Sequence, residues 1–219
     1  MERHFDEALK NLKEKILRMS GLVEESIGSS IRALSDRNSE LAYKVIKADD
    51  GINMLEIEID NLCLQLLALY QPTAGDLRFI ASTLKINNDL ERIGDLAVNI
   101  AERTLDLLKV PPLKIRIPIP KMAQAAQRML KDSLNAFVNK DSKLAYEVCK
   151  RDDEVDELNH EIFMELLKCT PEEQTPVERV IDLILVAKNL ERIADHSTNI
   201  CEDVIYMVDG KIIKHHITD

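Results

Sequence analysis

The stretch LERIGDLAVNIAE, residues 90–102, returns a hundred residues later as LERIADHSTNICE, residues 190–202. Eight of the thirteen positions are identical in the two copies. A phrase of this length that recurs within one chain is the signature of an internal repeat, and both copies must then form the same structural unit. The fold of the whole chain therefore follows from the fold of one half.

The similarity continues in front of this phrase. SELAYKVIKADD, residues 39–50, and SKLAYEVCKRDD, residues 142–153, match at eight of twelve positions. Between the halves, VPPLKIRIPIP, residues 110–120, holds four prolines and has the composition of a linker. We therefore predict a first repeat at residues 1–110, a Pro-rich linker at 111–120 and a second repeat at 121–219.

Each repeat is predicted to be helical. Apolar residues recur every three or four positions, which is the period of a helix, and the pattern is clearest in residues 41–66 and 90–107. Asn38-Ser39, Thr73 to Asp76 and Thr175-Pro176 have the composition of helix starts. We expect helices at about 3–36, 39–69, 74–109, 119–139, 142–168 and 175–208. Three long helices with short connections form an up-down-up bundle, so the predicted fold is all-α, with two tandem three-helix bundles.

The composition excludes several classes of protein. The net charge is −10, whereas proteins that bind nucleic acids or anionic lipid carry a basic face. No stretch reaches the roughly 18 apolar residues that cross a bilayer, and the first residues are charged. We therefore predict a cytoplasmic protein with no nucleic-acid partner and no membrane insertion. The four cysteines show no metal-binding spacing, and we expect them to be reduced and buried.

The repeated phrase has one apolar and one acidic side. At about 100° per residue, Leu90, Ile93, Ala97 and Ile100 share a stripe that is predicted to face the core. The opposite side carries oxygen ligands, and the second copy repeats the arrangement. These residues are Glu91, Asp95, Asn99 and Glu102 in the first copy and Glu191, Asp195, Asn199 and Glu202 in the second.

Paired carboxylates on these helices predict a metal site in each repeat. Carboxylates four residues apart repel each other by roughly 0.2–0.5 kcal/mol unless a cation lies between them. The neighbouring helices add further oxygen ligands. The candidate ligands are Glu91, Asp95 and Asp49 in the first repeat, and Glu191, Asp195, Asp152 and Asp156 in the second. Sites built from oxygen without sulfur suit divalent or trivalent ions such as Mg, Ca, Mn or Fe.

Other interpretations of the acidic residues remain open. A solvated acidic surface, neutralised in part by Arg92 and Arg192, is the simplest of them. His196 and His160 are interpreted as partly exposed helix histidines rather than ligands. A metal-storage helical protein is the alternative function. No enzyme is predicted, because the chain lacks a nucleophile with a base, a Gly-rich phosphate loop and core-facing Glu-x-x-His.

Two longer stretches carry a resemblance to a known family. QPTAGDLRFIASTLKINNDLERIGDLAVNIAE, residues 71–102, and VAKNLERIADHSTNICE, residues 186–202, resemble the two signature sequences of the PhoU family of phosphate-uptake regulators. That family's metal-associated motif, E/D-x-x-x-D, maps onto Glu91/Asp95 and Glu191/Asp195, and in a looser form onto Asp152/Asp156. Asp49 is followed at the fourth position by Asn53, so the first repeat departs from the motif there.

The resemblance also implies a function. It implies a homodimer of two-bundle chains that acts as a negative regulator of the phosphate-starvation response and of phosphate uptake. It implies partners as well, namely the ATPase subunit of a phosphate ABC transporter and a sensor histidine kinase, which the protein would couple to each other. These partners would hold the protein at the inner face of the membrane.

Overall fold

The computed structural model describes residues 2–112, 117–168 and 177–213. These residues form seven helices and contain no β-strand, which confirms the predicted all-α class. The helices are α1 (Glu2–Ser35), α2 (Ser39–Tyr70), α3 (Ala74–Leu108), α4 (Ile119–Asn139), α5 (Ser142–Cys149), α6 (Asp152–Lys168) and α7 (Val177–Asp209).

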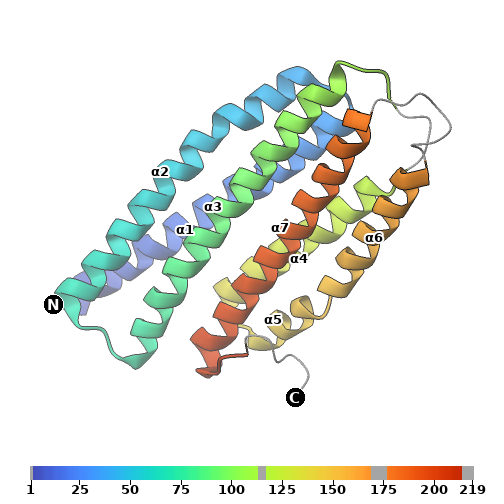
Figure 1. Cartoon of the computed structure of the whole chain (residues 1–219). Helices are drawn as coiled ribbons and strands as arrows, with labels where there is room; N and C mark the ends of the chain where they lie inside the picture. The colour runs from blue at the N-terminus through green and yellow to red at the C-terminus, as the bar shows by residue number, and fades with distance from the viewer. Residues whose placement is uncertain (1, 113–116, 169–176, 214–219) are drawn as a thin grey trace.

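The helices form two bundles that share one central interface (Figure 1). In the first bundle α1, α2 and α3 pack against one another, and in the second α7 packs against α4, α5 and α6. The bundles meet where α3 runs antiparallel to α7. At one end Arg78 donates to the carbonyl of Met207, and at the other Arg103 pairs with Asp182, with atom separations of 3.3 and 3.2 Å.

The apolar stripe of the repeated phrase lies in the core, as predicted. Leu90, Ile93, Ala97 and Ile100 are fully buried, and so are Leu190, Ile193, Ser197 and Ile200. The buried Ser197 hydroxyl donates a hydrogen bond to the Ile193 carbonyl at 2.7 Å, which compensates for its removal from water. One continuous apolar cluster runs from α1 to α7 through both bundles. The duplication therefore produces two bundles with a common core rather than two independent domains.

Side chains cap two equivalent helix starts, of which the sequence predicted the first. Asn38 caps α2 by accepting a hydrogen bond from the Leu41 amide, and Asp141 caps α5 by accepting one from the Leu144 amide, both at 3.0 Å. Thr73 differs, because its hydroxyl donates to the Asp76 carboxylate at 3.3 Å and no capping box forms. The predicted start at Thr175-Pro176 lies outside the described residues.

The helix predicted at 142–168 is wrong in one respect, because it is broken into α5 and α6. The break is a tight turn in which the Arg151 amide donates to the Val148 carbonyl and the Glu154 amide to the Arg151 carbonyl. Arg151 pairs with Asp132 of α4, and the first repeat has Ala48 at this position. Three acidic residues follow the break, where they interact favourably with the N-terminal end of the α6 dipole.

Two further sequence predictions concern cysteines and the membrane. Cys63, Cys149 and Cys201 are buried free thiols, and burial raises the pKa of Cys63 to about 12, which leaves that thiol unreactive. Cys169 is not among the described residues. No helix in the described part of the chain is long and apolar enough to span a bilayer.

Candidate functional site: two acidic patches

The paired carboxylates of α3 and α7 each face acidic residues of a neighbouring helix. The first acidic patch combines Asp49 and Glu56 of α2 with Glu91 and Asp95 of α3, whose charges interact across the helix boundary. The second acidic patch combines Asp152 and Asp156 of α6 with Glu191 and Asp195 of α7. The structure therefore brings together all seven predicted ligands, in one group of three and one of four.

Burial and mutual repulsion make these carboxyl groups weaker acids. In the second patch, burial and the neighbouring Asp195 and Asp156 raise the pKa of Asp152 from 3.8 to about 6. Burial and Glu191 raise the pKa of both Asp156 and Asp195. These shifts mean that the fully charged patch is costly for the folded protein.

The first patch shows the same effect more weakly. Burial raises the pKa of Asp49 against the opposing hydrogen bond from the Asn53 amide, whose nitrogen lies 2.9 Å from the carboxylate. Burial and Asp95 raise the pKa of Glu91, and burial and Asp60 raise that of Glu56. Asn53 therefore does more than occupy a ligand position, because it partly stabilises the charge of Asp49.

Two buried oxygen atoms indicate that the patches suit a cation. Oδ1 of Asp49 and Oδ1 of Asp152 are both buried and accept no hydrogen bond. The two aspartates occupy equivalent positions in the repeats, 103 residues apart. A buried acceptor without a donor costs about 1–3 kcal/mol. Oxygen ligands of this kind fit Mg, Ca, Mn or Fe.

Other observations oppose a preformed metal centre. Lys188 pairs with Glu191, and the Arg92 guanidinium lies 3.6 Å from both Glu91 and Asp95. Within the described residues, no three His, Cys, Asp or Glu side chains are arranged to hold a metal ion as they stand. A bound cation would therefore have to displace Lys188 or Arg92 and draw the carboxylates together.

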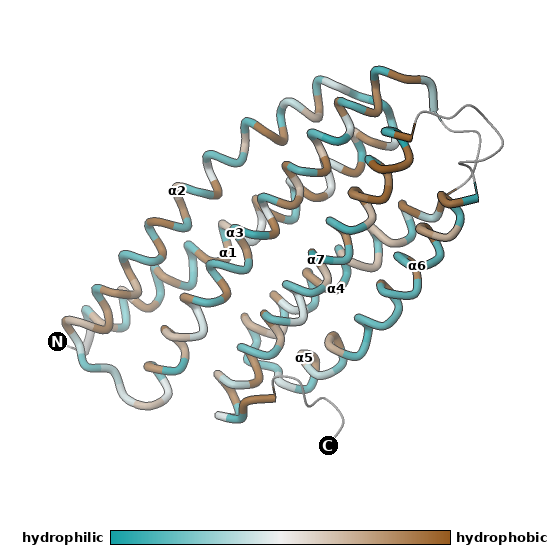
Figure 2. Tube along the Cα trace, viewed as in Figure 1, coloured by the Kyte–Doolittle hydropathy of each residue, from teal (hydrophilic) through white to brown (hydrophobic). Residues whose placement is uncertain are grey.

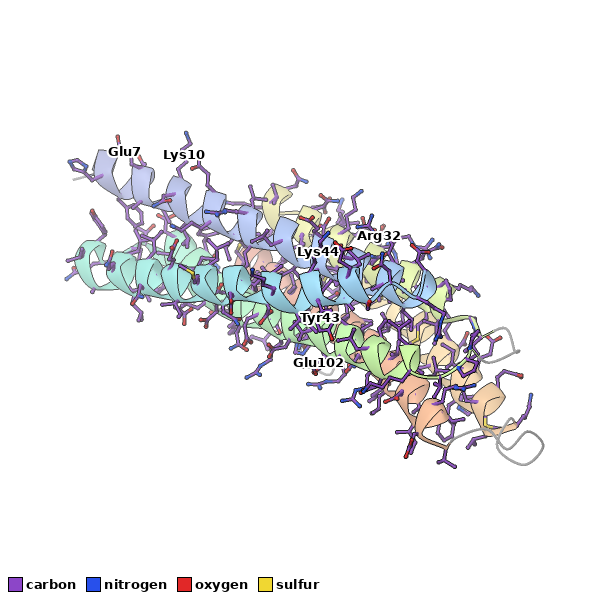
Figure 3. The ribbon with its side chains drawn as sticks, turned by 90° about the horizontal axis from the view of Figure 1, so that it is seen from above. Glu7, Lys10, Arg32, Tyr43, Lys44 and Glu102 are labelled. Atoms are coloured by element: carbon purple, nitrogen blue, oxygen red, sulfur yellow. The ribbon has the colours of Figure 1, made fainter. Side chains whose placement is uncertain are left out.

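The acidic side of the repeated phrase is not confined to one face of the molecule in the second copy. Asn199 donates to Asp89 of α3 at 3.4 Å, and Glu202 lines the same cleft, away from Glu191 and Asp195. In the first repeat, Glu102 lines a recess with Tyr43 of α2 (Figure 3). The ladder predicted in the second copy is thus divided between two surfaces, whereas Glu102 of the first copy faces α2, as Glu91 and Asp95 do.

The structure also reveals a contact that sequence reasoning missed. Nδ1 of His196 lies 2.8 Å from the Asp89 carboxylate and joins α7 to α3, and Lys85 pairs with Asp203 at the same distance. These pairs depend on the antiparallel register of the two bundles, for which the chain carries no local signal. Glu157 and His160 do have Glu-x-x-His spacing, but both are exposed and point away from the core.

We predict that the raised pKa of Asp152 makes stability depend on pH. Because the pKa is higher in the folded protein than the unfolded value of 3.8, the associated stability is present below pH 4 and is lost as pH rises through about 6. In the presence of chelator at pH 8, the free energy of unfolding of Asp152→Asn should therefore exceed that of the parent by about 1–2 kcal/mol after allowance for solvent screening. Thermal unfolding from pH 4.5 to 8 measures this difference.

Glu157→Gln serves as the matched control, since Glu157 is exposed further along α6 and is not among the charges that raise the pKa of Asp152. The stability of this control should change with pH in the same way as the stability of the parent. If the stability of Asp152→Asn also does so, the carboxyl group does not titrate between pH 4 and 6 and the patch is more solvated than its geometry implies.

Comparisons with known proteins agree with this architecture. A family model described as the PhoU domain matches residues 16–104 and 119–204. A phosphate-specific transport system accessory protein PhoU homolog of Aquifex aeolicus is 44% identical over 212 residues, which cover 96% of each chain. Homolog 1 of Thermotoga maritima is 38% identical over 218 residues, covering 98% of this chain and 93% of the other.

Solved structures show the same similarity. The crystal structure of PhoU from Pseudomonas aeruginosa superposes with a TM-score of 0.90 and 37% identity, over 94% of this chain and 100% of the other. The phosphate transport system regulatory protein PhoU from Streptococcus pneumoniae gives a TM-score of 0.88 and 30% identity, over 95% and 98%.

Proposed function

Because this chain belongs to the PhoU family, we propose that it is an accessory protein of a phosphate-specific transport system and a negative regulator of the phosphate-starvation response. The observation that carries the proposal is the match to such accessory proteins over nearly the whole chain, in both repeats. Their names describe an accessory and regulatory role rather than a catalysed reaction.

The finer part of the proposal concerns partners and assembly. The protein couples the ATPase subunit of a phosphate ABC transporter to a sensor histidine kinase at the cytoplasmic face of the membrane, and it acts as a homodimer. The resemblance of its signature stretches to those of the family supports these assignments. A net charge of −10 and exposed apolar side chains on α2 and α7 are compatible with basic, partly apolar partner surfaces.

A genetic experiment tests the regulatory role. In a host whose own PhoU-family gene is deleted, a phosphate-starvation reporter should be active even in high phosphate. Expression of this chain should restore repression of the reporter. Pull-downs in high and low phosphate then test the ATPase subunit and the kinase separately. A reporter that stays active with the chain expressed at normal levels would contradict the role, and sedimentation as a monomer at micromolar concentration would contradict the dimer.

The acidic patches are proposed to bind cations that stabilise the protein. The two equivalent buried oxygens of Asp49 and Asp152, and the repulsion within each patch, support this proposal. A bound ion would supply positive charge that joins α2 to α3 and α6 to α7. Metal storage, the alternative function, gains no support from the names of the relatives, which describe phosphate transport.

A further inference from the structure

The outer face of α2 carries a row of highly exposed apolar side chains. Tyr43, Met54, Ile57 and Leu64 are 63%, 64%, 58% and 58% exposed, respectively. α2 lies at the outer edge of the first bundle (Figure 1), and apolar segments recur along its length (Figure 2). Apolar residues exposed one at a time are ordinary, but four on one helix face, three of them within residues 54–64, form a row of the kind that interaction sites use.

The spacing of this row is that of a coiled-coil seam. Tyr43, Ile57 and Leu64 are separated by multiples of seven residues, and Met54 lies three residues before Ile57. Positions three and four residues apart alternate in this way when one helix packs along another. The α2 seam, meaning Tyr43, Met54, Ile57 and Leu64, spans about 32 Å at 1.5 Å per residue. A helical partner of about 21 residues would match this length.

The second repeat shows that the fold does not require these side chains. The positions equivalent to Met54 and Ile57 are Glu157 and His160, both exposed on α6. The same bundle therefore forms with polar residues at the middle of the row. Apolar residues at these positions in the first repeat alone have no structural reason within the chain, which leaves an external partner as their reason.

The two sides of the α2 seam differ in charge. Toward α1 the charges are compensated, because Lys15 pairs with Glu58 and Lys44 with Glu40. The first acidic patch lies toward α3, with Asp60 between the patch and the seam. Among the described residues, Arg92 is the only cationic residue that forms an ion pair with this patch. A partner that covers the seam therefore meets strong negative charge on one side only.

This asymmetry argues against a second copy of the chain as the partner. Lys47 and Asp50 lie on the same helix face as the α2 seam, between Tyr43 and Met54. Parallel pairing of two α2 helices would therefore place Lys47 against Lys47 and Asp50 against Asp50. Antiparallel pairing would place the acidic side of one helix against the acidic side of the other. Both arrangements bring like charges together, which costs affinity and selects against the wrong partner.

We propose that the α2 seam is a docking site for an amphipathic helix of a protein partner, with an apolar seam of its own and a row of Lys or Arg on the side that faces the first acidic patch. The apolar contacts supply affinity, and the basic row fixes the direction of the partner helix. The proposal does not depend on the transport-system assignment, because it follows from α2 and its neighbours alone.

A designed peptide tests the proposal with the full-length protein. The probe is a 21-residue helical peptide with Leu at the seam positions and Lys along one side, and its isomer carries Glu in place of that Lys. In chelator, fluorescence anisotropy should show micromolar binding of the Lys peptide that weakens with salt, and at least tenfold weaker binding of the Glu peptide.

The variants use residues that the fold already accommodates. The double variant Met54→Glu with Ile57→His replaces the two residues of the first repeat by their equivalents in the second. It should weaken peptide binding at least tenfold without lowering the melting temperature. His160→Ser, at the equivalent exposed position of α6, is the matched control and should leave binding unchanged.

Any one of several outcomes would overturn the proposal. They are failure of the Lys peptide to bind, undiminished binding to Met54→Glu with Ile57→His, equal binding of the Glu isomer, and conversion of a dimer to a monomer by that double variant in sedimentation. The last outcome would assign the seam to a second copy. Binding of the parent to anionic vesicles that the double variant loses would assign it to a membrane and would equally contradict a protein helix.

Discussion

Mn²⁺, Mg²⁺, Ca²⁺ or Fe²⁺ should raise the melting temperature of the parent protein, with each occupied acidic patch contributing about 2.7 kcal/mol at a hundredfold excess of ion over its Kd. For a chain of this size that free energy corresponds to about 5–10 °C per patch. The physical reason is that an ion bound only by the folded protein offsets the repulsion at Asp49 and Asp152 and satisfies their buried oxygens. Differential scanning calorimetry with each ion, and with chelator, measures the effect.

Neutralising one patch should remove about half of the stabilisation by metal. Glu91→Gln with Asp95→Asn eliminates the contribution of the first patch, and Glu191→Gln with Asp195→Asn that of the second. In chelator the same variants should melt no lower than the parent, because the substitutions remove repelling charges. The effect of each pair on stability thus depends on whether an ion is present.

The control for these variants is Asp50→Asn, which removes an exposed carboxylate from α2 beside Asp49. It should reduce the response to metal far less than either double variant. If calorimetry finds no ion bound more tightly than millimolar, and the double variants melt no lower than the parent in its presence, the patches are solvated surface and the metal proposal is wrong.

Leu90→Ala and Leu190→Ala should each lower the free energy of unfolding by about 2–5 kcal/mol, because each removes a fully buried side chain and leaves a cavity. The two residues are equivalent in the repeats and belong to one continuous core. Each substitution should therefore shift a single unfolding transition of the whole chain. Urea unfolding followed by circular dichroism gives the free energy and the number of transitions.

Lys10→Ala provides the comparison at an exposed position of α1, and should change stability by less than about 0.5 kcal/mol. Two separate transitions, of which only one responds to each leucine substitution, would show that the bundles unfold independently. In that case the interface of α3 with α7 contributes little, despite its buried hydrogen bond from Ser82 to the Asp203 carbonyl at 3.1 Å.

Features that depend on neighbouring residues in the chain could be predicted from the sequence. The repeat of residues 90–102 at 190–202 determined the all-α class and the two bundles, because apolar residues at helical spacing place one face of each helix in a core. Asn38 marked the start of α2 because a capping side chain reaches an amide only three residues away. The pairs Glu91/Asp95 and Glu191/Asp195 were also predictable, since residues four apart share a face.

Only the tertiary structure decided how the helices meet. The antiparallel crossing of α3 and α7 joins His196 to Asp89 and separates Asn199 and Glu202 from the second patch. Packing across α4 and α6 also decided the break before Asp152, where Arg151 turns toward Asp132. Burial of the oxygens of Asp49 and Asp152 required the neighbouring helix to be in place. The physical reason is the distance along the chain over which each interaction acts. Helix formation and capping involve residues three or four positions apart. The register between helices is set by the packing of whole apolar faces, which no short stretch of the chain encodes.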